Sequence, residues 1–79
     1  MNYGRLSQST KSKCVVRRIV LDSGGYERSG YHRGRYWGIG PKLWEVESVE
    51  GSDEGDSEHV RAVSKEAAKR HFPNAKWGR

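Results

Sequence analysis

Three segments of the chain alternate hydrophobic and polar residues at the spacing of β-strands. Residues 12–22 place aliphatic side chains on both sides of an extended backbone, with Arg17 on one side and Arg18 on the other. Apolar positions on both sides are typical of a central strand. Residues 42–50 alternate more regularly, and residues 58–63 form the third such segment. The chain is therefore expected to contain a sheet of at least three strands.

The second segment and the end of the chain show which side faces the core. Trp44 and Val46 are predicted to face inward. After the third segment, Ser64 is a favourable N-cap for a helix over residues 65–72, which Pro73 would end. We expect the indole of Trp77, beyond this helix, to fold back onto the core.

The order of these elements predicts an α+β fold. We expect an antiparallel sheet of three to four strands, joined by hairpins, with one C-terminal helix packed on a face. Residues 35–37 are the candidate for a short additional strand. Residues 1–11 show no periodicity and are predicted to be a flexible polar tail, which leaves residues 12–79 as a single small domain.

Composition restricts what so small a domain can do. Leu, Ile, Val and Phe together make up only 13 of the 79 residues, so the core is thin and a large enzyme fold is not expected. No apolar run reaches the length of about 18 residues that a membrane-spanning helix needs. The single cysteine, Cys14, has no partner for an internal disulfide, which suits a reducing compartment. The sequence thus predicts a protein of the host-cell cytoplasm that does not enter a membrane.

Charge is distributed unevenly along the chain. Residues 1–42 hold nine Lys or Arg and two acids, whereas residues 43–60 hold seven acids and neither Lys nor Arg. Residues 61–79 hold six Lys or Arg and one acid, so the net charge is +5. One interpretation is that neighbouring strands pair opposite charges across the sheet. The other is a positive face that binds a polyanion.

Few residues in the sequence suggest catalysis or a cofactor. The spacing of Cys14 and the three histidines matches no zinc pattern. The segment Gly38-Ile39-Gly40 lacks the third glycine of a dinucleotide-binding loop, and a strand rather than a helix follows it. No nucleophile and base stand in an activating motif. We therefore expect neither an enzyme nor a bound cofactor or metal.

Residues 23–40 carry the most distinctive pattern, with six Gly, three Tyr, three Arg and one Trp. Tyr, Trp and Arg dominate the energetics of interfaces, and they also stack on bases and bind phosphates. The alternative is that Tyr36 and Trp37 belong to the core while the arginines are merely solvated, and for Trp37 we expect the core position. The predicted partner-binding residues are Arg17, Arg18, Tyr26, Arg28, Tyr31, Arg33, Arg35 and Tyr36.

Three runs carry a resemblance to small proteins of prophages and plasmids. They are SGGY at 23–26, GRYWGIGPKLWEV at 34–46 and HVRAVSKEAAKRHFP at 59–73, within a resemblance that covers about residues 14–73. The chain is similar in this way to anti-CRISPR inhibitors of a type I surveillance complex (Cascade), with type I-C as a candidate. The resemblance implies a protein that binds a Cascade subunit and blocks target DNA binding. Many such inhibitors are acidic mimics of DNA, whereas this chain is basic.

Two other functions remain open from the sequence. The basic character and the interleaved aromatic residues also suit a small nucleic-acid-binding protein of a mobile element. The oppositely charged segments could also meet across the twofold axis of a homodimer, which would enlarge a thin core.

Overall fold

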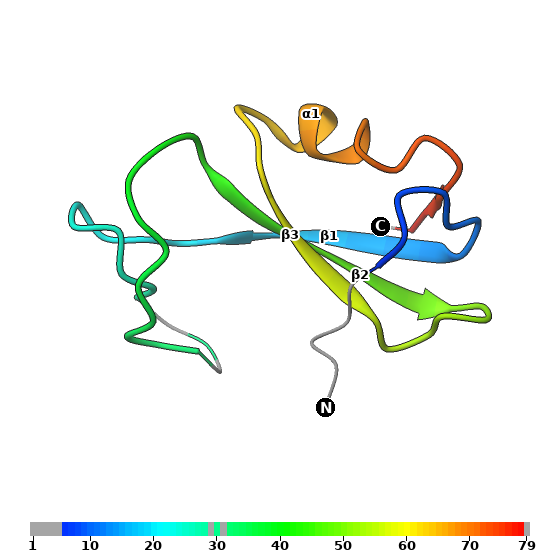
Figure 1. The fold of residues 1–79 in the computed structure, drawn as a ribbon, viewed down its shortest axis with the longest axis horizontal. Helices are drawn as coiled ribbons and strands as arrows, with labels where there is room; N and C mark the ends of the chain where they lie inside the picture. The colour runs from blue at the N-terminus through cyan, green and yellow to red at the C-terminus, as the bar shows by residue number, and fades with distance from the viewer. Residues whose placement is uncertain (1–5, 29, 31, 79) are drawn as a thin grey trace.

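Four strands and one helix make up the fold in the computed structural model, which describes residues 6–28, 30 and 32–78. The elements are β1 (Lys13–Ile19), β2 (Leu43–Glu50), β3 (Ser57–Arg61), α1 (Lys65–Lys69) and β4 (Lys76–Trp77). The strands form a single sheet in the order β3-β2-β1-β4, and α1 lies over one face of it (Figure 1). The α+β class is confirmed, and β1 is a central strand as its pattern indicates.

Two features of the predicted architecture are wrong: the sheet is mixed, and the helix is not C-terminal. β1 pairs antiparallel with β2, and β2 with β3, but β4 follows the helix and pairs parallel to β1. The pairing is short, with the amides of Lys76 and Gly78 donating to the carbonyls of Ser12 and Cys14 over 3.0 and 2.9 Å. The connection through α1 brings the chain back to the edge of β1 in the same direction as β1. A strand of two residues is too short to show an alternation in the sequence.

Several boundaries also differ from the prediction, and β1 spans Lys13–Ile19 rather than residues 12–22. Residues 35–37 are not a strand of the sheet, because Tyr36 forms only an isolated bridge with Tyr26. The helix ends at Lys69 rather than at residue 72, and β3 ends at Arg61 rather than at residue 63. The start of the helix is as expected: the Ser64 hydroxyl accepts from the Ala67 amide over 3.1 Å.

The hydrophobic core lies between α1 and one face of the sheet. Trp44 and Val46 point toward the core, as predicted. Phe72, which follows the C-terminal end of α1, is also fully buried there. The indole of Trp44 donates to the Ala62 carbonyl over 2.9 Å, so its polar atom is satisfied inside the core. The ring of Trp77 packs edge-on against Phe72, at 6.5 Å between centroids, which confirms that it folds back. We call the face of the sheet opposite α1 the open face.

Part of the predicted tail is packed against the domain. Residues 1–5 lie outside the described residues, but Leu6 is buried in the core and its amide donates to the Ser57 carbonyl over 3.3 Å. Thr10 is also buried, and its hydroxyl donates to the Asp53 carboxylate over 2.6 Å. Residues 6–11 therefore belong with the structured domain.

The Asp53 carboxylate joins three segments of the chain. It accepts hydrogen bonds from the hydroxyls of Thr10, Ser12 and Ser48, and so connects the N-terminal segment, β2 and the turn after β2. These bonds, first of all the one from Ser12, lower the pKa of Asp53 because they stabilise its charged form. The N-terminal segment is thus held by an ionised carboxylate as well as by Leu6.

Replacing Asp53 with alanine is expected to destabilise the fold by about 1–3 kcal/mol, because it leaves the buried hydroxyl groups without their acceptor. The measurement is urea unfolding at pH 7. Glu54→Ala is the matched control, since Glu54 is exposed on the same turn, and its effect is expected to stay within about 0.5 kcal/mol.

The difference between wild type and Asp53→Ala should shrink as the pH falls below about 4. A carboxylate with a lowered pKa stabilises the fold above its unfolded pKa, and this contribution is lost as it protonates. Equal stability of Asp53→Ala and Glu54→Ala at pH 7 would contradict the role of Asp53.

Candidate partner-binding surface

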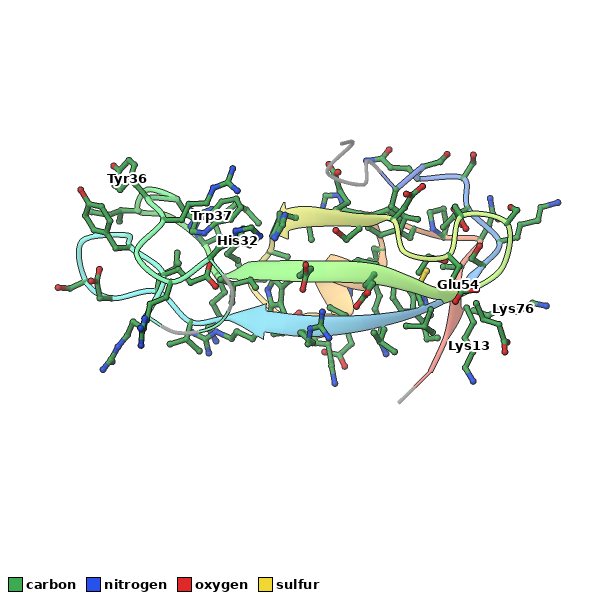
Figure 2. The ribbon with its side chains drawn as sticks, turned by 90° about the horizontal axis from the view of Figure 1, so that it is seen from below. Lys13, His32, Tyr36, Trp37, Glu54 and Lys76 are labelled. Atoms are coloured by element: carbon green, nitrogen blue, oxygen red, sulfur yellow. The ribbon has the colours of Figure 1, made fainter. Side chains whose placement is uncertain are left out.

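Residues 21–40 form a lobe at one end of the sheet (Figures 1 and 2). We call it the arginine–tyrosine lobe; residues 29 and 31 within it lie outside the described part of the chain. It begins as a continuation of β1, in which the Asp22 amide donates to the Tyr26 carbonyl over 2.9 Å. The bridges Leu21–Glu27 and Tyr26–Tyr36 then fold it back on itself. This segment is therefore a bridged, hydrogen-bonded unit.

Asp22 and Gly25 shape the first turn of the lobe. The Asp22 carboxylate accepts from the amides of Gly24 and Tyr26 over 2.9 and 3.0 Å, which is a local capping arrangement typical of aspartate. Gly25 has a φ of 87°, and a Cβ there would lie 2.6 Å from the carbonyl carbon of Gly38. The amide of Trp37 also donates to the Gly25 carbonyl over 2.8 Å. Only glycine permits the two arms of the lobe to approach so closely.

Arg61, at the end of β3, fastens the lobe to the sheet. Its guanidinium donates to the carbonyls of Trp37 and Gly38 over 2.6 and 2.9 Å, and to that of Pro41 over 2.7 Å. One side chain of β3 thus holds three backbone carbonyls of residues 37–41. The sequence did not identify this residue, because nothing in the local pattern distinguishes it from an arginine exposed to solvent.

Trp37 lies on the open face of the sheet and is absent from the core, so the expected core position is wrong. Its ring packs on His59 of β3 at 4.6 Å between centroids, and the guanidinium of Arg35 lies 4.4 Å from the ring centroid on the same indole. The indole nitrogen donates to the Glu27 carboxylate over 3.0 Å. Two features explain why Trp37 lies on the open face. Glu27, which is only 7% exposed, gives its indole a polar partner there, and Trp44 already fills the core under α1.

The surroundings of His59 favour the neutral form of its imidazole. Burial lowers its pKa, and Arg35 lowers it further, whereas Glu45 opposes this shift. The lowered pKa therefore disfavours an ion pair across the 3.8 Å between His59 Nε2 and Glu45 Oε2.

The predicted partner-binding residues fall into two groups. The structure brings Tyr26, Arg28, Arg33, Arg35 and Tyr36 together in the lobe, while Tyr31 lies outside the described residues. The rings of Tyr26 and Tyr36 lie 4.9 Å apart and remain 47% and 61% exposed. Arg28 and Arg33 are exposed and form no ion pair within the described part of the lobe.

Arg17 and Arg18 lie outside the lobe, on opposite faces of β1. On the open face, the Arg17 guanidinium contacts the carboxylates of Glu45 and Glu47 at 2.7 and 2.9 Å. This is the cross-strand pairing that the charge distribution also predicted, and it leaves Arg17 poorly suited to bind an anion. Arg18 is exposed on the face that carries α1.

A cleft of about 440 Å³ lies where the lobe meets the sheet. It is lined by Arg17, Arg18, Ile19, Val20, Glu27, Gly30, His32, Glu45 and His59. Its carboxylates are engaged, since Glu27 accepts from Trp37 and Glu45 from Arg17. Among the described residues, no group of three or more His, Cys, Asp or Glu side chains is placed to hold a metal ion.

No family model matches the chain, and neither a curated protein nor a solved structure matches it. In the described part of the chain, no helix has the length and apolar character needed to cross a membrane.

Replacing Arg61 with alanine is expected to release the lobe while leaving the core intact. Three hydrogen bonds to a charged donor are lost, which corresponds to roughly 2–4 kcal/mol of local stability. The measurement is amide hydrogen exchange: the Trp37 and Gly38 amides should exchange at least tenfold faster, and those of β2 should change little. Arg70→Ala, at the exposed end of α1, is the control. Unchanged exchange in the lobe of Arg61→Ala would show that other contacts hold it.

Acidification is expected to destabilise the protein through His59. Its folded-state pKa lies below the ordinary histidine value of about 6.5, so the unfolded chain binds more protons as the pH falls below that value. Stability should therefore decrease between about pH 7 and the folded-state pKa, and less so in His59→Phe, which keeps a ring against Trp37. An NMR titration of His59 checks the shift directly, and a midpoint above 6.5 would contradict it.

Proposed function

We propose that this protein is a non-enzymatic binding module whose arginine–tyrosine lobe docks on the anionic surface of a nucleoprotein complex. The sequence resemblance directs the proposal to a type I CRISPR surveillance complex, whose binding of target DNA the protein would block. The proposal rests on one observation: the lobe carries two exposed arginines, Arg28 and Arg33, that form no ion pair with any described residue, and it also exposes a pair of tyrosine rings.

The acidic side chains of the lobe form no ion pair with these guanidinium groups in the described part of the chain. The lobe's only carboxylates are Asp22, which caps the first turn, and Glu27, which is buried against Trp37. Arg28 and Arg33 thus remain available to phosphates or carboxylates of a partner. Arginine is well suited to this because its planar fork can bind either group through two hydrogen bonds.

The aromatic residues add apolar contact to the charged groups. Tyr26 and Tyr36 expose neighbouring rings, and Ile39, on the same lobe, is 81% exposed. Aromatic and arginine side chains are enriched among the residues that dominate the binding energy of protein interfaces. The acidic turn after β2, with Glu54, lies at the far end of the sheet from Tyr36 and Trp37 (Figure 2). This separation would keep its negative charge away from an anionic partner.

Direct binding to free nucleic acid is the second candidate function. The same tyrosine pair could stack on unpaired bases, and the same arginines could contact the backbone phosphates. This function would give an affinity for DNA alone that falls by orders of magnitude as salt rises.

Replacing Arg28 and Arg33 together with glutamate is expected to weaken inhibition by about tenfold or more, because two attractive contacts become repulsive. The assay is a gel shift near physiological salt, in which a type I Cascade is incubated with the protein before labelled target DNA is added. Lys65→Glu with Arg70→Glu is the matched control, since it makes the same charge change on α1.

The wild-type protein should reduce the Cascade shift without shifting the DNA alone. A DNA shift by the protein alone, at a similar concentration, would favour the second candidate. If the lobe variant and the α1 variant inhibit equally, or if the wild-type protein leaves Cascade binding intact, the first proposal is wrong.

A further inference from the structure

The edge of β1 contains a gap between two segments that pair with it. At one end, β4 covers only Lys13 and Cys14. At the other end, the Arg28 amide donates to the Val20 carbonyl over 3.0 Å. The backbone between Cys14 and Val20 has no neighbour on this side among the residues that the structure describes, and it spans about 20 Å.

The hydrogen bonds of the sheet show which backbone groups face the gap. Ala62 donates to the Lys42 carbonyl, and Ser48 to that of Asp56, both over 2.9 Å, so the even-numbered residues of β2 bond to β3. The odd-numbered residues of β2 therefore bond to their partners on β1, which are also odd-numbered.

The even-numbered residues of β1 consequently point away from β2. Cys14 and Val20 show this directly, since their carbonyls accept from Gly78 and Arg28. Val16 and Arg18 lie between them, and their amides and carbonyls have no partner within the described chain. A strand next to β1 would satisfy all four groups.

We infer that this gap receives an extended, acidic peptide segment of a protein partner as an additional strand. The partner would contribute backbone hydrogen bonds to Val16 and Arg18, as in other cases of strand addition. This interface adjoins the arginine–tyrosine lobe at Arg28, but it does not depend on which complex the lobe binds.

The charges around the gap favour acidic side chains. Arg18 is exposed within it, while Lys13 and Arg28 are exposed at its two ends. The nearby acids compensate this charge only in part: Glu27 is buried, and Glu45 and Glu47, which contact Arg17, belong to β2 on the far side of β1 from the gap. A segment with glutamate or aspartate side chains would therefore find compensating charge along its length.

The shape of the gap disfavours a second copy of this chain. β4 and residues 26–28 each project beyond β1 by one strand spacing, about 4.8 Å, so the edge is recessed. Two recessed edges cannot meet, because their flanking segments would collide first. A single extended peptide has no such flanks.

Amide exchange of the labelled protein by NMR tests the inference. In the free protein, the amides of Val16 and Arg18 should exchange at least tenfold faster than those of Arg17 and Ile19. An acetylated decapeptide of alternating Glu and Thr should then protect Val16 and Arg18 by about tenfold or more. Arg18→Glu should weaken binding of this peptide about tenfold, whereas Arg33→Glu, the same change on the lobe, should weaken it less.

Two control peptides separate strand addition from charge attraction. The first alternates Lys and Thr; the second is the acidic peptide with every backbone nitrogen methylated, which keeps the charge but removes the donors. Both should leave Val16 and Arg18 unprotected. Equal binding of the methylated peptide, or a failure of the acidic peptide to protect the two amides, would overturn the inference. Concentration-dependent protection without peptide would show self-pairing instead, and would also overturn it.

Discussion

α1 and the two ends of the chain supply apolar cover for only one face of the sheet. Phe72 and Trp77 complete the core on that face, and Leu6 closes it from the N-terminal side. With so few aliphatic residues in the chain, the open face is stabilised differently, by ion pairs around Arg17 and by Trp37 packed on His59. The lobe is thus both the candidate binding surface and part of what covers the sheet. A partner that pulled on the lobe would also expose the polar residues beneath it.

The strands and the helix start could be predicted from the sequence because their signals are local. The alternation in β1 and β2 and the cap at Ser64 each lie within a few residues. β4 could not be predicted, since its two residues pair only because the helix returns the chain to β1. The position of Trp37 likewise depends on Glu27 and His59, which are distant in sequence and meet only in the fold.

The sequence indicated which residue types make up the candidate site, but not which contacts hold these residues in place. The aromatic and arginine pattern identified the lobe, yet it grouped Arg17 with the lobe arginines although Arg17 is occupied by two carboxylates. It also missed Arg61, whose role is to hold backbone carbonyls. Composition indicates which side chains can bind a partner, whereas hydrogen-bond partners decide which of them are available.

The position of Cys14 makes the thiol a reporter of how the sheet opens. The side chain is fully buried beneath the core, its thiol donates to the Ser12 carbonyl over 3.6 Å, and burial raises its pKa. Both effects slow the reaction of the thiol with an alkylating reagent, because that reaction needs an accessible thiolate. Cys14 is one of the two residues that β4 pairs with, so detachment of the C-terminal segment is one opening that would expose the thiol. The rate of alkylation would then measure how often the core around Cys14 opens, in a chain with no other cysteine to react.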